Sequence, residues 1–485
     1  MSAEEARGAG RGAVAAGLLA LAVYLVGVCP VVFWGDSAEL SRRAVTLELS
    51  PVARGYPLHR VLTWVAGRIA GDPALGANLV SAVFGAVSVA LVYEVARRIA
   101  GSWWAGATAA VVTGLAHTFW TYSEVAEVYT LHTAILLAAL LVAVLADSGG
   151  VRARWALGAV LGLSLLHHRM IVFAIPGIVW WMWTGVPAGQ RGRAVRDVLF
   201  GVLAGALPFV VLCLLKSRSP PPETASRVWW WFEDVFMGGE RNASFVLGEG
   251  RKGMLASAVY LGRWLVFNLP GPALLLAVAG FLRAPRRAGA FLGVLTLASA
   301  WFPLRYDWTG DQYTFLIPLY PVLAIAAGIA VARAAERRPR LAAALLASVA
   351  AAPLLLYGVL AGTDLGPRTF PGLSPSAARD MLWPPRTGDR EPLEWSAERL
   401  RALPPAAHLH ADWGDGQVFL YLQEARGLRP DVRVEVWNWK IKLGDGSGEE
   451  WVSALPFQRE LPKAVAAVRD RLEPRGDGLF RVKPR

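Results

Sequence analysis

Long apolar runs recur along most of this chain and constrain its fold more than any other feature. A run of about 20 apolar residues can cross a bilayer as one helix. Hydrophobic residues make up 55% of the sequence and charged residues only 18%, whereas a soluble domain carries about 25% charge. The sequence therefore predicts a polytopic α-helical membrane protein with about eleven transmembrane helices. The runs lie at roughly 13–33, 75–96, 103–119, 128–146, 155–167, 170–185, 197–215, 256–282, 288–304, 313–332 and 341–361.

Basic residues between the runs predict the orientation of the chain. Short cytoplasmic loops carry an excess of Lys and Arg. Arginines precede the first run, and a basic cluster follows each even-numbered run, with members at Arg7, Arg11, Arg97, Arg98, Arg152, Arg154, Arg191, Arg193, Arg196, Arg283, Arg286, Arg287, Arg333, Arg337, Arg338 and Arg340. This pattern puts the N-terminus in the cytoplasm and the C-terminus outside. It also accounts for much of the net charge of +12, and because no nucleic-acid motif accompanies that charge, no nucleic-acid partner is expected.

The segment from Trp155 to Trp183 is interrupted by His167-His168-Arg169. A single long span here would invert every later loop and place three basic clusters outside. Two short helices that meet at His167–Arg169 keep the charge rule throughout, so we predict that arrangement. It places two imidazoles and a guanidinium at or below the outer membrane surface, where polar groups are costly and usually functional.

An acidic pair, Asp36 and Glu39, follows the first apolar run. Taken alone, Asp36 could be a solvated cap at the start of a helix. The predicted outer face, however, also carries His167–Arg169, the segment 117–132 and the segment 304–313. The cytoplasmic loops are short and merely basic, so any chemistry is expected outside, in a first loop at about 34–74 and a large loop at about 216–255.

Within the first outer loop, residues 58–69 have apolar side chains at helical spacing. This stretch is too short to span a membrane and suits a helix that lies in the interface. It could be a simple surface helix, or it could guide a lipid-linked substrate sideways into the site.

The chain becomes polar and rich in proline after about residue 362. We predict a membrane domain over 1–361 and an extracytoplasmic α/β domain over 362–485. Within the latter, 407–412 and 431–437 are expected as strands, and 415–425 as a helix capped by Asp415. No glycine-rich phosphate fingerprint is present, so a nucleotide site is not expected.

Cysteine and histidine usage argues against disulfides and resident metals in this chain. Cys29 and Cys213 both lie in apolar runs, so neither a disulfide nor a cysteine metal site is expected. Glu124 and Glu127 have His117 and His132 nearby, but their spacing matches no standard ligand set. We therefore expect no metal and no required cofactor. The first run resembles an uncleaved signal anchor, and the richness in Ala, Arg and Gly suggests a bacterial inner membrane, with the active face periplasmic.

Several short motifs resemble the GT-C glycosyltransferases, membrane enzymes that use polyprenyl-phosphate-linked sugars. The similarity is greater to the transmembrane O-mannosyltransferase-like family of animals and bacteria. It spans most of the chain in order, although each motif alone is weak. The motifs are Trp34-Gly35-Asp36-Ser37-Ala38-Glu39, Gly55-Tyr56-Pro57-Leu58, Glu127-Val128-Tyr129-Thr130-Leu131, Gly162-Leu163-Ser164-Leu165-Leu166-His167-His168, Gly414-Asp415, Tyr421-Leu422-Gln423 and Arg429-Pro430-Asp431-Val432.

The resemblance implies a GT-C-like fold and transfer of a hexose, with mannose favoured, from a polyprenyl-phosphate donor. The acceptor would be a hydroxyl of a protein, a glycan or a lipid. One element departs from the family pattern, because Val52-Ala53-Arg54 stands where a His-Pro-Pro-like sequence is usual. Donor or acceptor preference could therefore differ from that of the relatives.

Such a transfer needs a base for the acceptor hydroxyl and donors for the departing phosphate. Asp36 is the candidate base, and direct displacement would invert the anomeric centre. Glu39, one helical turn further on, would face the same side and orient the acceptor, or be a helix-start charge. Candidate phosphate ligands are His168, Arg169, Arg54, His59 and Arg305, although Arg305 could merely snorkel. Candidate acceptor or sugar ligands are Glu124 and Glu127, which would lie on one helical face, together with Tyr129 and His167.

Two other classes fit a chain with many spans. A transporter or flippase of lipid-linked sugars would also carry charge at membrane depth, but it usually shows an internal repeat, and none is visible here. A non-catalytic envelope assembly protein would use its α/β domain to bind a partner.

Overall fold

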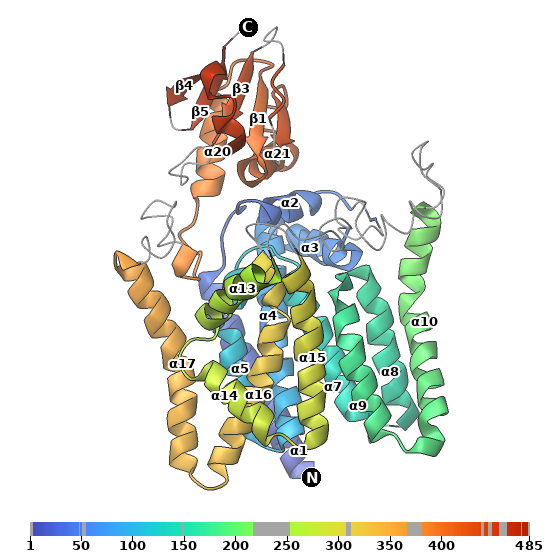
Figure 1. The fold of residues 1–485 in the computed structure, drawn as a ribbon. Helices are drawn as coiled ribbons and strands as arrows, with labels where there is room; N and C mark the ends of the chain where they lie inside the picture. Colours follow the sequence, from blue (N-terminus) through green and yellow to red (C-terminus); the bar gives the residue numbers. More distant parts are fainter. Residues whose placement is uncertain are drawn as a thin grey trace.

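Each apolar run contains a helix in the computed structural model, and these helices pack as a bundle (Figure 1). The structure describes residues 3–47, 49–50, 55–147, 150–216, 253–306, 312–365, 381–437, 441–444, 449–454, 463–476 and 478–483. The bundle consists of α1 (Ala3–Gly27), α4 (Pro73–Ala100), α5 (Trp103–Gly114), α7 (Tyr129–Ala146), α8 (Gly150–Leu163), α9 (Ile175–Gly185), α10 (Arg191–Lys216), α13 (Met254–Asn268), α14 (Ala273–Arg283), α15 (Arg286–Arg305), α16 (Leu319–Ala335) and α17 (Pro339–Gly362).

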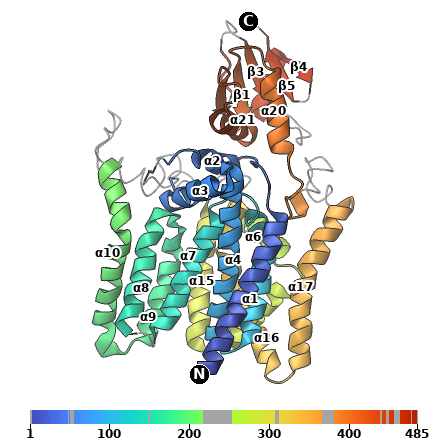
Figure 2. The ribbon, with the colours of Figure 1, turned by 180° about the vertical axis from the view of Figure 1, so that it is seen from behind.

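The number of membrane spans stays a prediction. Among the described residues, six helices are long and apolar enough to cross a bilayer, and α13 with α14 forms a bent apolar pair. The other bundle helices have 11 to 17 residues, whereas a straight span needs about 20. The N-terminus and the C-terminal domain lie at opposite ends of the bundle (Figures 1 and 2), as an odd number of spans requires.

The predicted break near residue 167 is confirmed. Helix α8 passes into a short 3₁₀ helix, η1 (Ser164–Leu166), and a second one, η2 (Arg169–Ala174), leads into α9. His167 lies between them with φ −131° and ψ −119°, outside the helical region of backbone angles. The charged segment is therefore a true discontinuity between two short helices.

The helices differ in their bounds from two of the apolar runs. The run 256–282 forms α13 and α14, which are bent by 101°, because Pro270 and Pro272 flank Gly271, whose φ is 67°. Proline lacks the N–H that would continue a helix and disfavours helical geometry in the preceding residue. For the same reason α1 ends at Gly27, three residues before Pro30, rather than near residue 33.

Helices α8 and α10 pack closely along paired glycines. Gly158 and Gly162 on α8 face Gly201 and Gly205 on α10, and an added Cβ at any of the four would collide with the backbone of the other helix. Helices in lipid associate largely through such close van der Waals packing, because lipid tails provide no hydrophobic driving force between them.

Two short helices lie across the end of the bundle that faces the C-terminal domain (Figures 1 and 2), namely α2 (Asp36–Arg43) and α3 (Pro57–Ala70). The predicted short helix at 58–69 is thus confirmed as α3. Its apolar side chains Val61, Val65 and Ile69 are exposed, whereas His59 and Arg60 are buried. An apolar outer face and a polar inner face suit a helix at a membrane interface.

The C-terminal domain has a five-stranded sheet in the order β2-β1-β3-β5-β4, in which β1 is parallel to both β2 and β3. Helix α20 (Glu391–Ala402) leads from the bundle to it, as Figure 1 shows. The two predicted strands and the helix between them are confirmed, but the helix begins at Trp413 with Asp412 at its N-cap, so Asp415 lies within its first turn rather than capping it. The remaining elements are β1 (His408–Asp412), α21 (Trp413–Arg426), β2 (Arg433–Trp437), β3 (Glu450–Ser453), α22 (Lys463–Ala466), β4 (Leu472–Gly476) and β5 (Leu479–Val482).

The C-terminal domain packs directly on the first outer loop. Val32, Ala38 and Ala74 of the membrane domain share one apolar core with residues of α20, β1 and α21. Arg42 on α2 pairs with Glu424 at 2.8 Å, and Arg426 pairs with Asp72 at 2.6 Å. Because exposed ion pairs each contribute at most about 1 kcal/mol, the shared apolar core is the main attachment.

Candidate active site

The loop between α1 and α2 is held in one conformation by buried hydrogen bonds. Asn78 on α4 is fully buried and donates to the carbonyls of Cys29 and Val31 at 2.8 and 3.0 Å. Gly35 has φ 62° and ψ −129°, which a side chain would disfavour. Its N–H donates to the carbonyl of Gly414 at 3.0 Å. The glycine of the Trp-Gly-Asp motif therefore joins the two domains immediately before Asp36.

Asp36 is the first residue of α2, and its carboxylate remains exposed. The indole N–H of Trp413, the first residue of α21, donates to Asp36 Oδ1 at 2.6 Å. A short hydrogen bond to an ionised acceptor is stronger than one between neutral groups and fixes the direction of the carboxylate. The sequence prediction missed Trp413, because nothing in the local sequence links it to a residue nearly four hundred positions earlier.

Asp36 lines a cavity of about 230 Å³ at the outer end of the bundle. The structure brings three predicted residues together there, Asp36, Glu127 and Tyr129. It adds two polar residues that the sequence prediction missed, Tyr122 and Thr314. The Tyr129 hydroxyl lies 3.0 Å from Thr314 Oγ1, and the rings of Tyr122 and Tyr129 stack at 5.8 Å. The complete lining is Phe33, Trp34, Asp36, Ser37, Tyr122, Val125, Glu127, Tyr129 and Thr314.

A cluster of aromatic and imidazole rings continues from Tyr129 into the bundle. The ring of His168 lies 5.8 Å from Tyr129, 5.1 Å from His132 and 5.6 Å from Tyr56, on which it stacks. His168 Nδ1 accepts the N–H of Met170 at 3.3 Å, so Nε2 carries the proton and is the donor. Tyr56 adopts φ 43°, a left-handed conformation that is uncommon for a residue with a side chain.

The other predicted members of this region face inward and brace the backbone. His167 is fully buried, and its Nε2 donates to the Val128 carbonyl at 2.9 Å. Arg169 donates to the His167 carbonyl at 2.7 Å and lies over the ring of Phe209. His59 is buried, with its ring stacked 6.0 Å from that of His167. None of the three is among the residues that line the Asp36 cavity.

The two predicted acidic pairs are not arranged as the spacing suggested. Glu39 is buried and pairs with Arg43 of the same helix, so it does not line the cavity with Asp36. Residues 123–128 form turns rather than a helix, which separates Glu127 from Glu124. Glu124 is fully buried and accepts the indole N–H of Trp120 at 2.7 Å. Burial raises its pKa to about 8, so at neutral pH this carboxyl is mostly protonated.

One predicted cation and one histidine lie elsewhere. Arg305 is exposed at the end of α15 and is absent from the cavity lining. Arg54 and the altered Val52-Ala53-Arg54 element lie outside the described residues, as does nearly all of the predicted large loop at 216–255. His117 contacts the Leu382 carbonyl at 3.1 Å through Nε2 and so joins α6 (His117–Tyr122) to the chain that leads to α20.

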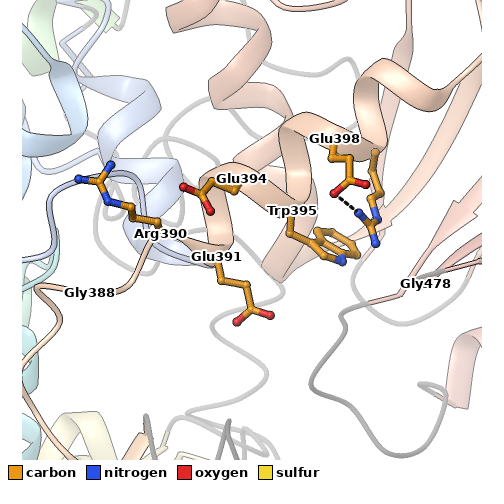
Figure 3. A pocket seen from close by; sticks show the side chains of 8 residues that line it. Gly388, Arg390, Glu391, Glu394, Trp395, Glu398 and Gly478 are labelled. Atoms are coloured by element: carbon orange, nitrogen blue, oxygen red, sulfur yellow. Dashed lines mark ion pairs between the residues drawn. The ribbon is translucent and has the colours of Figure 1, made fainter.

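A larger, open pocket of about 710 Å³ lies beside α20 and shares no lining residue with the Asp36 cavity (Figure 3). Glu391, Glu394 and Glu398 line it together with Arg390 and Arg399, and Glu398 pairs with Arg399 at 2.9 Å. Charged groups that pair with one another or face water suit a solvated surface. The Asp36 cavity, which combines a carboxylate, tyrosines and an adjoining ring cluster, is therefore the candidate active site.

Comparison with known proteins supports the resemblance seen in the motifs. Residues 36–187 match the family model of the N-terminal domain of protein O-mannosyl-transferase TMEM260. Protein O-mannosyl-transferase TMEM260 of Mus musculus is 26% identical over 465 residues, which cover 88% of this chain and 62% of that protein. The chain thus spans less than two thirds of the length of this relative, and such sequences are not confined to bacteria.

Solved structures show the same fold. ArnT from Cupriavidus metallidurans in the apo state has a TM-score of 0.59 at 17% identity, and ArnT bound to undecaprenyl phosphate has a TM-score of 0.57 at 18% identity. Each alignment covers 97% of both chains. The GT-C-like fold and the similarity to O-mannosyltransferase-like proteins are therefore confirmed, and the chain is an integral membrane protein.

Proposed function

We propose that this protein is a GT-C-type glycosyltransferase that transfers a hexose from a polyprenyl-phosphate donor to a hydroxyl on the extracytoplasmic side. One observation carries the proposal, namely that Asp36 lines a cavity with Glu127 and Tyr129 at the outer end of an apolar bundle. The segment that matches the TMEM260 family begins at Asp36 and includes the other two residues. Mannose is the favoured sugar, because that relative is an O-mannosyl-transferase.

In the proposed reaction the acceptor oxygen attacks the anomeric carbon, and its proton passes to the carboxylate of Asp36. The new C–O bond forms as the bond from the anomeric carbon to the phosphate oxygen breaks. The leaving group is the polyprenyl phosphate, which takes both electrons of that bond, and the anomeric configuration inverts. No covalent sugar–enzyme intermediate and no cofactor are needed. The indole N–H of Trp413 holds the carboxylate in the orientation required for proton transfer.

The donor phosphate is assigned to the ring cluster that adjoins the cavity. His168 offers an Nε2–H donor beside Tyr129, and donors aimed at developing negative charge stabilise the transition state. His59 and Arg169 support this cluster from within the bundle. Arg54 and Arg305 are candidate phosphate ligands on the basis of the sequence alone. ArnT, which has the same fold, binds undecaprenyl phosphate, and the exposed apolar face of α3 suits a lipid-linked donor that enters from the membrane.

The acceptor side is assigned to Glu127 and Tyr129, which line the cavity with Asp36. Carboxylate and phenol oxygens are well suited to hold the hydroxyls of a sugar or an acceptor. Glu124 and His167 then act as buried supports for the loop that carries them. The acceptor is a protein, glycan or lipid hydroxyl, and we place the reaction on the periplasmic face of a bacterial inner membrane.

The test is release of polyprenyl phosphate by the purified full-length protein, supplied with a panel of polyprenyl-phosphate sugars and acceptors. Asp36→Asn removes the base, so its rate should fall by about 10²–10⁴-fold while its thermal stability is kept. Asp470→Asn, at an exposed position in the C-terminal domain, is the matched control and should leave the rate unchanged. Full activity of Asp36→Asn would refute the base assignment, and absence of release from every donor would refute the transferase.

A further inference from the structure

The C-terminal sheet carries a second cluster of chemistry-bearing side chains, well away from Asp36. His408 and His410 lie two residues apart on strand β1, between β2 and β3, and therefore share one face of the sheet. The parallel register places Glu450 of β3 beside His408, and Glu435 of β2 beside His410. Three adjacent strands thus present two imidazoles and two carboxylates on the same face. The sequence pattern predicted only a strand over this stretch.

The side chains of His408, His410 and Glu450 lie close enough together to act as ligands of one metal ion. One ligand atom from each of His408, His410 and Glu450 can be chosen so that all three lie within 4.8 Å of one another. His410 Nε2 lies 3.5 Å from Glu450 Oε2. A tetrahedral Zn²⁺ with bonds of about 2.0–2.1 Å separates its ligand atoms by roughly 3.4 Å. The cluster therefore needs only a side-chain adjustment of about 1 Å to hold an ion.

His410 supplies a second, independent observation. Its side chain is 1% exposed, and Nε2 makes no hydrogen bond of normal geometry, since Glu450 Oε2 lies 3.5 Å away. A buried polar atom without a partner costs about 1–3 kcal/mol, so native structures rarely leave one unless something binds it.

Neighbouring groups form hydrogen bonds to His408 and Glu450 like those that orient the ligands of a bound metal ion. Glu435 Oε2 lies 3.0 Å from His408 Nε2, which is the carboxylate–histidine arrangement that orients a ligating imidazole. The N–H of Gly444 donates to Glu450 Oε2 at 2.9 Å. Glu450 and His410 are buried, whereas His408 and Glu435 are partly exposed, so an ion could enter from the solvent side.

We infer that His408, His410 and Glu450 bind one Zn²⁺, with Glu435 orienting His408. Two imidazoles and a carboxylate suit zinc, and three protein ligands leave one position for water. The ion would join β1 to β3, and β1 leads directly into Trp413, which holds Asp36. Zinc would therefore stabilise β1, the strand that ends next to Trp413 and so helps to position its indole beside Asp36. The inference does not depend on the proposed transfer reaction.

The test measures zinc bound to the full-length protein in detergent, after treatment with a chelator and titration with Zn²⁺. The wild type should bind one Zn²⁺ per chain at this site, and its melting temperature should rise with zinc and fall with chelator. Glu450→Gln should lose this zinc and the melting shift. Glu435→Gln should weaken binding by about 10–100-fold. Glu449→Gln, at the adjacent exposed position that pairs with Arg481, is the matched control and should bind as the wild type does.

Two further measurements test whether the zinc is bound at the sheet and not elsewhere in the protein. His132→Gln changes the histidine cluster in the bundle and should leave zinc at the sheet in place, so loss of zinc there would overturn the assignment. If Glu450→Gln does not fold, the absorption spectrum of the Co²⁺-substituted wild type should show tetrahedral nitrogen and oxygen coordination. A wild type that binds no zinc, or a folded Glu450→Gln that binds it with unchanged affinity, would refute the site.

Discussion

The hydrogen bond from Trp413 to Asp36 makes the C-terminal domain part of the candidate active site, and Trp413→Phe tests the proposed role of this contact directly. The substitution keeps most of the ring packing and removes the N–H that lies 2.6 Å from Asp36 Oδ1. A hydrogen bond to a charged group contributes about 1.5–3 kcal/mol. Because Asp36 is exposed and water can replace the indole, we expect the lower end of this range.

A loss of about 1.5 kcal/mol corresponds to a rate reduction of roughly tenfold. We expect that reduction in kcat, with little change in KM for the donor, because the indole orients the base rather than the lipid-linked sugar. The assay is release of polyprenyl phosphate under saturating donor. Trp451→Phe in the same domain is the matched control, since the indole nitrogen of Trp451 has no hydrogen-bond partner, and this variant should keep the wild-type rate.

A double-mutant cycle decides whether the two residues act together. In the Asp36→Asn background, Trp413→Phe should cost little or nothing further, because the carboxylate that the indole orients is gone. Two outcomes contradict the reasoning, namely a Trp413→Phe variant with the full wild-type kcat, or a tenfold loss that persists unchanged in the Asp36→Asn background. The melting temperature of each variant separates a loss of orientation from a loss of folding.

Three further predictions concern stability in detergent. Burial raises the pKa of Asp415 from 3.8 to about 7, so its contribution to stability is fully present below about pH 4 and is lost as the pH rises through about 7. The stability of Asp415→Asn relative to the wild type should therefore be greater at pH 8 than at pH 4, by up to about 4 kcal/mol. An equal difference between variant and wild type at both pH values would contradict the raised pKa of Asp415. Gly162→Val should separate α8 from α10 and lower the melting temperature markedly, whereas Gly189→Val, with open space around its Cα, should not. Asn78→Ala removes the amide donor from the buried carbonyls of Cys29 and Val31, of which, among the described residues, only Val31 keeps another donor, the Cys29 thiol at 3.3 Å, and should cost about 1–3 kcal/mol. Thermal unfolding that matches the wild type would show that the loop before Asp36 does not depend on this clamp.

The sequence predicted the helices well because each is a local consequence of composition. A long apolar run can satisfy its backbone in lipid only as a helix, and the break at His167 follows from charge placed inside such a run. Where the helices depart from the apolar runs, the cause is also local. The bend between α13 and α14 depends on Pro270 and Pro272, which a hydropathy run does not register.

The candidate site was only partly predictable for a different reason. Asp36, Glu127 and Tyr129 were found because their residue types and motifs point to sugar transfer, and they do line one cavity. Helical spacing wrongly placed Glu124 beside Glu127, because the intervening residues form turns. Tyr122 and Thr314 carry no motif and could be found only from their position in space.

By itself, therefore, the sequence determined that this chain is a membrane bundle with a carboxylate after its first helix and a small α/β domain, since apolar length, charge placement and strand periodicity act over neighbouring residues. Only the tertiary structure decided which groups meet. It brought Trp413 to Asp36, Glu435 to His408 and Glu450 to His410, and it turned Glu39 and His167 inward. These contacts join residues that are distant in sequence, and they arise from the packing of one domain on another and from the register of strands, neither of which a local pattern encodes.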